Sequence, residues 1–430
     1  MLRSLVVVPR KLYYLQRAMA VQWASRASIE ALRLTRLRRI VAFAEVNVPL
    51  YRESFRKAGV RAADLRSLAD LRHFPFVTRE EVVAAYPEGI LSRAPRPDDV
   101  VFRTSGTSGL FMQIAYDAAA NDFLDAIYAR ALFSTGYRPW DKIAYFWWDA
   151  APKPTRIYER LGLMKKDLLP VDPDPNVQLA ALDALRPDVV YHFPSSLLLL
   201  ARVVEREPHH ALRPRLIIAH GELMTDEQQR EIARVFGCPV FNQYGAQEFN
   251  RMGWDCDRHD GLHEDADSVC LEIVDENRVV DDGEVGELVV TGLVNTLMPL
   301  IRYRIGDAGK RLIGGCACGR GLPRIALTEG RLDDVLVLPS GARIGPRTIA
   351  PRVEALRGFT QYRVEQVARD RVDVSLVKER DAPSSLEADV GRVVREVLGG
   401  EAHVEVRAVE SIALSRRGKL RKIVRRSLDG

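Results

Sequence analysis

The segment Thr104-Ser105-Gly106-Thr107-Ser108-Gly109 concentrates four hydroxyl side chains and two glycines in six residues. Glycine lets backbone amides turn toward an anion, and each hydroxyl adds a hydrogen-bond donor, so this composition suits a loop that binds phosphate. The segment is not a Walker A motif, because no Gly-Lys-Ser/Thr follows it. Taken alone, an ordinary Ser/Gly turn explains it equally well.

Two later segments carry side chains that suit the rest of a nucleotide. Tyr244 follows an expected parallel strand at its carboxyl end, where open α/β sheets bind ligands, and its ring can stack on a purine. Glu248 is a carboxylate of the kind that binds Mg²⁺ beside phosphates. Asp307, directly after Gly306, can accept hydrogen bonds from both hydroxyls of a ribose. Each also has an ordinary explanation: Tyr244 as a core residue, Glu248 as a surface cap and Asp307 as a turn residue.

Lys419 lies near the end of the chain in a strongly basic segment. Residues 411–426 contain seven Lys or Arg and no acidic residue. An ammonium group placed against a carboxylate and an α-phosphate would stabilise the negative charge that develops in a transition state. The alternative is a solvated run of charges.

Five segments, in this order, resemble motifs of the adenylate-forming superfamily, which contains acyl-CoA synthetases, adenylation domains and luciferases. TSGTSG is similar to its phosphate loop and Lys419 closes its C-terminal Gly-Lys element. The others are similar to its Tyr-Gly-x-x-Glu, Tyr-Arg-Thr-Gly-Asp and Gly-Arg-x-Asp-Asp elements, at 242–248, 303–307 and 330–334. The resemblance implies that ATP and a carboxylic acid form an acyl-adenylate with release of pyrophosphate, and that the acyl group then passes to an acceptor.

The resemblance also assigns roles to residues. Lys419 and Glu248 would be catalytic, with Glu248 also binding Mg²⁺, and Asp333 would be a hinge about which a small C-terminal domain swings between the two half-reactions. The residues expected to bind the nucleotide are Thr104, Ser105, Gly106, Thr107, Ser108, Gly109, Gly221, Glu222, Asn242, Gln243, Tyr244, Gly245, Asp307 and Arg331.

Three cysteines and a histidine form a second constellation. Cys256, His263, Cys316 and Cys318 supply a full tetrahedral set for structural zinc, although His259 competes with His263 and free buried cysteines are common. The set also resembles the phenylacetate-CoA ligase branch, with its capsule-biosynthesis and coenzyme F390 synthetase-like relatives, in which a similar set frames the Tyr-Gly-x-x-Glu element. The zinc would pin the loop of Tyr244 and Glu248. Cys238 and Cys270 are expected in the core.

One departure from the superfamily concerns the phosphate loop. In most relatives a lysine follows its last glycine, whereas here Leu110-Phe111-Met112-Gln113 follow, which predicts weaker binding of pyrophosphate. Coenzyme A is the acceptor that the branch implies, and an amine or a carrier-protein thiol is the alternative. A second alternative is a catalytically weak scaffold or membrane-associated protein. The aromatic runs 146–148 and 191–193 suit an aryl acid, but a small organic acid and a core role stay open.

The elements that must position these residues form an α/β fold. In residues 11–60 the apolar positions have helical spacing, and we expect Pro49 to end this helical run. Strands at 189–193, 216–219 and 239–241 alternate with helices, the second of which, 226–236, has a capping box at Thr225 and Gln228. Residues 269–274 and 287–291 indicate antiparallel strands. After residue 330, strands at 335–338, 372–377 and 404–409 surround a helix at 385–398.

Length and composition bound the remaining classes. A chain of 430 residues predicts two domains, which we place at 1–330, with a basic helical leader at 1–60, and at 331–430 as a mobile lid. No stretch is apolar enough to span a bilayer, and neither a secretory signal nor a disulfide scaffold is present, so we expect a cytoplasmic protein. Residues 1–40 contain nine Lys or Arg and one acidic residue. This segment is either a solvated basic face or a surface that contacts anionic lipid. No motif favours nucleic acid.

Overall fold

The computed structural model describes residues 2–104, 112–147, 157–207, 210, 212–331, 334–413 and 420–426. The chain divides into two compact units, each made of two segments. One contains Met1–Tyr137 and Phe241–Ala326, and the other contains Arg138–Val240 and Leu327–Gly430.

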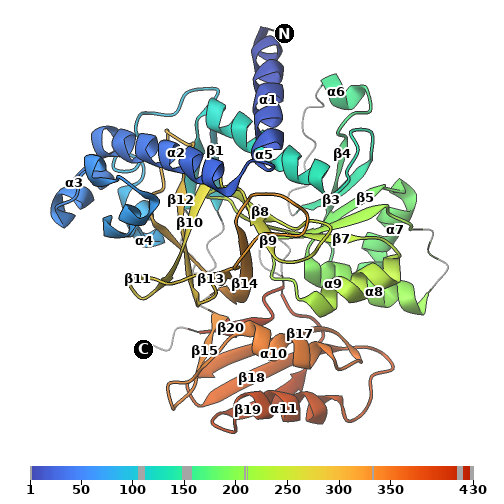
Figure 1. Ribbon diagram of the computed structural model, residues 1–430. Coiled ribbons are helices and arrows are strands. Elements are labelled where there is room, and N and C mark those ends of the chain that lie inside the picture. Colours follow the sequence, from blue (N-terminus) through green and yellow to red (C-terminus); the bar gives the residue numbers. More distant parts are fainter. Residues whose placement is uncertain are drawn as a thin grey trace. The chain divides into compact units, whose positions relative to one another are not determined.

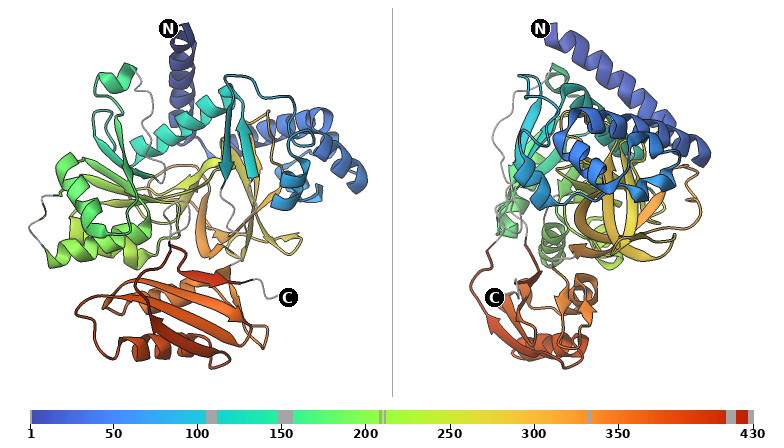
Figure 2. Two further views of the ribbon diagram at one scale, coloured as in Figure 1. Left: turned by 180° about the vertical axis from the view of Figure 1, so that it is seen from behind. Right: turned by 90° about the vertical axis from the view of Figure 1, so that its left-hand side faces the viewer.

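Helices dominate the first half of the first unit. They are α1 (Leu2–Val21), α2 (Arg26–Asn47), α3 (Pro49–Ala58), α4 (Arg79–Ala85) and α5 (Ala118–Ser134), with short 3₁₀ turns at Ala62–Asp64 and Leu68–His73 and a hairpin of β1 (Val100–Thr104) and β2 (Met112–Tyr116). Helices α1 and α5 lie side by side (Figures 1 and 2). The helix before Pro49 ends where predicted, because α2 stops at Asn47, but Pro49 also begins a further helix. Pro49 occupies the first turn of α3, where its missing N–H costs no hydrogen bond.

The second half of this unit is a sheet built from antiparallel strand pairs. Its strands are β7 (Val240–Ala246), β8 (Asn250–Trp254), β9 (Leu262–Glu264), β10 (Val269–Asp275), β11 (Arg278–Val279), β12 (Val285–Gly292), β13 (Tyr303–Arg311) and β14 (Arg324–Arg331). Their order is β11-β10-β12-β13-β14-β9-β8-β7. The predicted antiparallel strands correspond to β10 and β12, which pair with each other.

The second unit begins with a parallel sheet, in the order β6-β5-β3-β4. Its elements are β3 (Ile143–Trp147), α6 (Ile157–Arg160), β4 (Lys166–Pro170), α7 (Pro175–Leu185), β5 (Val189–His192), α8 (Pro194–Arg206), β6 (Leu216–His220) and α9 (Asp226–Phe236). Helix α9 has the predicted bounds, because Thr225 and Gln228 form the capping box and Gly237 ends the helix.

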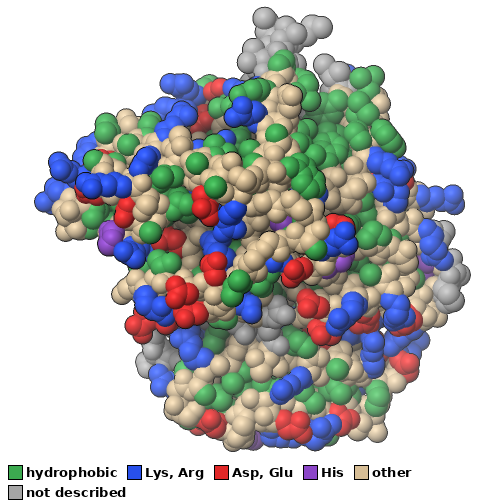
Figure 3. All heavy atoms as spheres, viewed as in Figure 1, with side chains coloured by type: hydrophobic (Ala, Val, Ile, Leu, Met, Phe, Trp, Pro, Cys, Tyr) green, Lys and Arg blue, Asp and Glu red, His purple; other side chains and the backbone are tan. Residues whose placement is uncertain are grey.

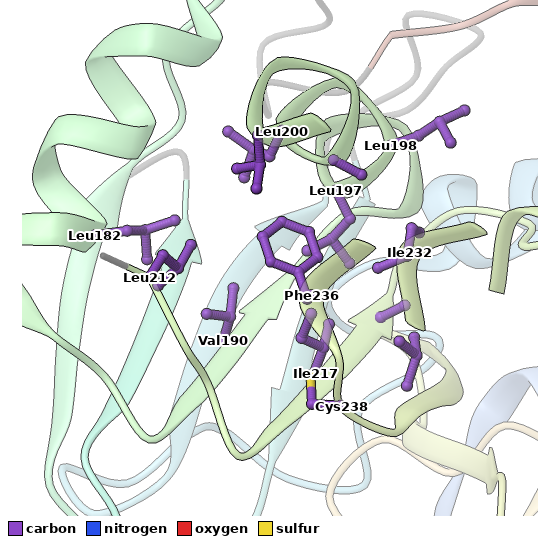
Figure 4. Close-up of a cluster of buried hydrophobic side chains, with 14 of the residues drawn as sticks. Leu182, Val190, Leu197, Leu198, Leu200, Leu212, Ile217, Ile232, Phe236 and Cys238 are labelled. Atoms are coloured by element: carbon purple, nitrogen blue, oxygen red, sulfur yellow. The ribbon is translucent and has the colours of Figure 1, made fainter. Parts of the chain in front are cut away.

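The core of the parallel sheet lies between its strands and helices α7, α8 and α9. Figure 4 shows Phe236 and Ile232 of α9 and Leu197 of α8 directed toward Val190 and Ile217 on the strands. All five side chains are buried. Burying aromatic and branched apolar side chains is the main stabilising term for such a layer, at about 1.5–3 kcal/mol each. Cys238 joins this core and Cys270 is buried in the first unit, as predicted for both cysteines.

The C-terminal segment of the second unit has its own hydrophobic core. Its elements are β15 (Leu336–Val337), β16 (Arg343–Ile344), α10 (Pro346–Glu354), β17 (Phe359–Ala368), β18 (Arg371–Lys378), α11 (Leu386–Val397), β19 (His403–Ala408) and β20 (Ile423–Arg425). The sheet order is β19-β18-β17-β20, and α10 and α11 cover one face of it (Figures 1 and 2). The predicted α/β fold is confirmed, whereas the domain boundary at residue 330 stays a prediction.

Several basic side chains of the N-terminal segment form ion pairs with carboxylates of the first unit. Arg10 donates to Asp122 at 2.7 Å, Lys11 pairs with Asp125, and the buried Arg33 pairs with Glu264 at 2.8 Å. Exposed Lys and Arg side chains gather instead over α2 and α3, at the left of Figure 3. Among the described residues, no helix is long and apolar enough to cross a membrane.

Candidate active site

The Tyr-Gly-x-x-Glu element forms the hairpin between β7 and β8. Tyr244 pairs with Gly253, and the ladder shifts its register between Tyr244 and Gly245, which is a β-bulge. A Cβ atom on Gly245 would lie 2.3 Å from the carbonyl oxygen of Asn250, so only glycine fits at this close approach of the two strands. The hairpin therefore holds Tyr244 and Glu248 on one short, constrained loop.

Tyr244 and Asp307, two residues predicted separately from sequence, are in direct contact. The Tyr244 hydroxyl donates a 2.8 Å hydrogen bond to Oδ2 of Asp307, although 63 residues separate them in the chain. Asp307 lies in an irregular stretch of β13, where the register with β12 shifts and Gly306 has a φ of 80°. Gly306 thus serves a bulge within a strand, whereas the sequence suggested a turn.

Glu248 has an arginine partner that sequence reasoning missed. Its Oε1 lies 3.3 Å from a guanidinium nitrogen of Arg79, the first residue of α4, and both side chains are largely buried. The hydroxyl of the buried Tyr116 donates to the carbonyl of Gln247, and burial, followed by the charge of Glu248, raises the pKa of Tyr116. No local pattern could have linked Arg79 to a residue 169 positions away.

The four predicted zinc ligands form one cluster. The donor atoms of Cys256, His263, Cys316 and Cys318 all lie within 4.8 Å of one another. Sγ of Cys256 is 3.7 Å from Sγ of Cys316, and Sγ of Cys318 is 3.3 Å from Nε2 of His263. A tetrahedral zinc with Zn–S near 2.3 Å requires sulfur atoms roughly 3.8 Å apart, so the spacing fits the ion.

The chemistry of this cluster also fits a cation. Burial raises the pKa of the Cys256 thiol to about 12 and lowers the pKa of His263 to about 4. A neutral imidazole is ready to bind a metal, and a bound cation would favour the thiolate that burial alone disfavours. His259, the competing candidate, is 39% exposed and its Nδ1 lies 2.6 Å from Asp255, outside the cluster.

The cluster joins segments that are distant in the chain. Cys256 follows β8, His263 lies on β9, and Cys316 and Cys318 lie between β13 and β14. Gly321 donates to the carbonyl of Gln22 at 3.0 Å, which attaches the same loop to the turn between α1 and α2. The cluster therefore brings together the end of β8, strand β9 and the connection between β13 and β14.

In the second unit, Gly221 and Glu222 follow β6. Oε2 of Glu222 accepts a hydrogen bond of 3.0 Å from the backbone N–H of Ser195 in the first turn of α8. Among the described residues, its buried Oε1 has no hydrogen-bond partner.

Aromatic side chains separate onto the two faces of the parallel sheet. Phe146 and His192 stack at 3.9 Å between ring centroids in the helix-covered core, which is the core role that the sequence left open for these two residues. On the other face, the ring of His220 lies among four aromatic rings at centroid distances between 4.5 and 6.4 Å. They belong to Tyr145, Trp147, Tyr191 and Phe193. Trp148 lies outside the described residues.

Several predicted residues cannot be placed. Ser105, Gly106, Thr107, Ser108, Gly109, Asp333 and Lys419 lie outside the described residues. Thr104 ends β1 and Arg331 ends β14. Asn242, Gln243 and Tyr244 are consecutive on β7, and Gln243 accepts a hydrogen bond of 3.2 Å from Arg251 on β8.

Comparison with known proteins identifies relatives of the whole chain. The chain is 32% identical to a phenylacetate-coenzyme A ligase of Pseudomonas putida over 350 residues, which cover 78% of each protein. It is 30% identical to the enzyme of the same name from Aromatoleum evansii over 385 residues, which cover 86% of this chain and 85% of that one. No protein-family model matches the chain.

Solved structures agree on the fold. A 2-hydroxyisobutyryl-CoA ligase in the postadenylation state superposes with a TM-score of 0.77 at 22% identity, covering 94% of this chain and 91% of that one. The resemblance expected from the sequence motifs is thereby confirmed. Because the chain is this similar in sequence to the two phenylacetate-coenzyme A ligases over most of their length, it belongs to the phenylacetate-coenzyme A ligase family.

Proposed function

We propose that this protein is an AMP-forming acid–thiol ligase that uses ATP to activate a carboxylic acid and then transfers the acyl group to coenzyme A. The observation that carries the proposal is the 2.8 Å hydrogen bond between Tyr244 and Asp307, which joins two motifs of the superfamily within a chain of this family. In the proposed reaction both residues bind the nucleotide. A scaffold protein has no nucleotide to bind and would not need them.

The reaction has two balanced steps. In the first, a carboxylate oxygen attacks the α-phosphorus of ATP, and the bond to pyrophosphate breaks. In the second, the thiolate sulfur attacks the acyl carbon, and the bond to AMP breaks. Lys419 stabilises charge in the first step, and a swing of the C-terminal domain about Asp333 separates the steps and keeps water from the acyl-adenylate.

The residues proposed to bind the nucleotide are those that the sequence motifs indicate. The Tyr244 ring stacks on adenine and the Asp307 carboxylate accepts from the ribose hydroxyls. Glu222 contributes its open carboxylate oxygen, and the hydroxyl-rich segment 104–109 contributes donors to the phosphates. Gly221, Asn242, Gln243, Gly245 and Arg331 complete the proposed set.

Magnesium and zinc have different roles in the proposal. Glu248 would hold Mg²⁺ together with ATP phosphates, because this ion uses one or two carboxylates and keeps its other positions for phosphate and water. Zinc would be held by Cys256, His263, Cys316 and Cys318. With four protein ligands it has no open position, so it supplies structural bracing and no chemistry.

The acid and the acceptor are the finer parts of the proposal. An aryl or small organic acid is favoured, with the aromatic rings around His220 as the observation that supports an aryl group. Coenzyme A is favoured over an amine or a carrier protein because the curated relatives are named as coenzyme A ligases. The membrane alternative loses support because Arg10 and Lys11 are paired with carboxylates. A cytoplasmic location, where ATP and coenzyme A are available, completes the proposal.

The test is ATP–pyrophosphate exchange with a panel of aryl, short-chain and hydroxy acids, followed by detection of the thioester after coenzyme A is added. We expect exchange with at least one acid, its loss in Lys419→Ala, and thioester formation with the same acid. Protein that binds ATP but exchanges pyrophosphate with none of the acids would contradict the proposal. Exchange without thioester, but with an amide product, would favour the amine acceptor.

A further inference from the structure

Arg79 is the basic side chain in contact with Glu248, the proposed Mg²⁺ ligand. A guanidinium nitrogen of Arg79 lies 3.3 Å from Oε1 of Glu248, and the two side chains are only 14% and 8% exposed. Charge-assisted hydrogen bonds are usually about 2.7–2.9 Å long, so this pair is not drawn to its shortest distance. The contact places one cation beside a carboxylate that has a second cation to bind in the proposed reaction.

Two cations at one carboxylate need a further anion. When Mg²⁺ reaches Glu248, its charge repels the guanidinium of Arg79, and the repulsion is strong where water is largely excluded. The phosphates of ATP arrive together with Mg²⁺ and can neutralise both cations. A guanidinium has five N–H groups in a planar fork, so one arginine can contact a carboxylate and a phosphate at the same time.

The backbone of Arg79 is fixed by the two residues before it. Val77 forms a bridge to Tyr303 at the start of β13, with two main-chain hydrogen bonds of 3.0 and 2.9 Å to the neighbours of Tyr303. Thr78 then caps α4 in a reciprocal capping box. Arg79 is therefore attached to the strand that also carries Asp307, the proposed ribose ligand.

Helix α4 also lies next to two hairpins that the proposed function assigns to ATP binding. It packs against β2 of the β1–β2 hairpin, and the hydroxyl of Tyr116 at the end of β2 donates to the carbonyl of Gln247 in the β7–β8 hairpin at 2.8 Å. Residues 110–113, which follow the hydroxyl-rich segment, contain no Lys or Arg. Positive charge for the phosphates has therefore to come from Mg²⁺ and from another element, and Arg79 is already beside Glu248.

We propose that Arg79 binds the β- and γ-phosphates of ATP and the pyrophosphate that they become. The inference rests on the proposed function and adds a residue to it. When the carboxylate oxygen bonds to the α-phosphorus, the bond to pyrophosphate breaks and its electron pair stays on the leaving oxygen. Arg79 stabilises this charge by donating N–H groups to the leaving phosphates, and it transfers no proton.

Arg79→Met is the principal test, because methionine keeps much of the apolar side-chain length and removes the charge. We expect Kd for ATP and Kd for pyrophosphate, each measured by calorimetric titration, to rise about 10- to 100-fold, as for the loss of hydrogen bonds to a charged group. Kd for AMP, which lacks both outer phosphates, should stay nearly unchanged. Thioester formation from synthetic acyl-adenylate and coenzyme A should keep its rate, since pyrophosphate has left by then.

The same titrations in magnesium-free buffer with EDTA separate direct contact from an effect transmitted through Glu248. A direct contact predicts that Arg79→Met still weakens ATP binding when Mg²⁺ is absent. Arg79→Lys, which keeps a positive charge, should recover most of the affinity. If Arg79→Met does not fold, as judged by thermal unfolding, Arg79→Gln replaces it, because its amide can donate to Glu248 but carries no charge for phosphate.

Arg72→Met is the matched control. Arg72 is an exposed arginine seven positions earlier, and its side chain contacts the neighbouring His73 at 3.4 Å. This variant should bind ATP, pyrophosphate and AMP as the wild type does. A general weakening caused by the loss of any arginine from this region would appear here as well and would contradict the assignment to Arg79.

The outcomes separate this inference from the function it rests on. A folded Arg79→Met variant with unchanged Kd for ATP overturns the inference, and so does an equal loss of AMP affinity, which would indicate a general structural role. A loss seen only with Mg²⁺ present also overturns it, because Arg79 would then act through Glu248 alone. The proposed function fails separately, if the wild type binds ATP but exchanges pyrophosphate with no acid.

Discussion

Oδ2 of Asp307 accepts a 2.8 Å hydrogen bond from the hydroxyl of Tyr244, and this contact joins a β-hairpin to a bulge in another strand of the same unit. The phenol orients the carboxylate, and the carboxylate fixes the edge of the aromatic ring. The two residues therefore have separable contributions to the binding of ATP, which substitutions can measure.

Asp307→Asn should raise KM for ATP in the exchange assay about 10- to 100-fold, because charged hydrogen bonds to the ribose contribute about 1.5–3 kcal/mol. Tyr244→Phe keeps the ring and loses only the hydroxyl, so its KM should rise about 2- to 10-fold. Tyr13→Phe, at an exposed position, is the control. An unchanged KM in Asp307→Asn would remove this residue from the nucleotide site.

Glu248→Gln should weaken the dependence of exchange on Mg²⁺, with an apparent Mg²⁺ affinity about 10- to 100-fold lower at fixed ATP. The neutral amide cannot attract the ion, and it also leaves Arg79 without its carboxylate partner. Titrating Mg²⁺ against the exchange rate measures the effect. Glu80→Gln, at the exposed neighbour of Arg79, should behave as the unchanged protein, and equal affinities in both variants would argue against Glu248 as a metal ligand.

Cys318→Ser should lose the zinc that we expect at about one ion per chain. Its melting temperature should fall by about 5 °C or more, because the metal contributes folding free energy at this site. Zinc content is measured on the purified protein by elemental analysis. Cys238→Ala removes a buried cysteine that belongs to the core of the other unit, so this variant should be less stable but keep the metal. Zinc-free wild-type protein with normal stability would contradict the assignment.

Glu354 predicts a pH-dependent part of stability. Burial opposes its charge, but Lys422 and Gln228 outweigh burial and lower its pKa below the usual 4.5. A lowered carboxyl pKa contributes stability that is fully present above pH 4.5 and is lost as the pH falls through the folded-state pKa. The difference in melting temperature between the wild type and Glu354→Gln should therefore be larger at pH 7 than at pH 3.5. Equal differences at both values would show that the charge of Glu354 does not matter.

Gly245→Ala should distort the hairpin that carries Tyr244 and Glu248. Its Cβ atom would meet the backbone of Asn250, which cannot move aside as a flexible side chain would, so we expect a loss of about 1–3 kcal/mol and a higher KM for ATP. Gly315→Ala, where a Cβ meets no atom within 4 Å, is the matched control. Thermal unfolding and the exchange assay measure both effects, and normal behaviour of Gly245→Ala would contradict the packing described here.

The sequence predicted those parts of the fold whose signals are local. Helix α9 has the predicted bounds because Thr225, Gln228 and Gly237 determine its ends through contacts within the helix itself. Pro49 correctly predicted the end of α2, but the start of α3 at the same residue was not predicted, although proline is well tolerated in the first turn of a helix. Whether Phe146 and His192 lie in the core could not be predicted, because alternation alone does not say which face of a strand is covered by helices.

In the candidate site, too, only the features with local sequence signals could be predicted. Tyr244 and Asp307 could be selected because their motifs are contiguous, but their contact depends on two irregular strands whose register the sequence does not reveal. Arg79 carried no signal at all. It is one of many arginines in a basic chain, and only the folded structure places it against Glu248.

The pairing of the basic N-terminal helices with later residues constrains how the chain can be made. Arg33 forms an ion pair with Glu264, and Arg36 donates to the carbonyl of Asp267, 231 positions further on. At about 5–20 residues per second, a ribosome needs roughly 12–46 s to synthesise that interval. Helix α1 finds its partners on α5 within the first third of the chain, whereas α2 has left the ribosome long before the partners of Arg33 and Arg36 are made. The full docking of α2 must therefore await more than half of the chain, and this interval is when a nascent-chain chaperone would be most needed.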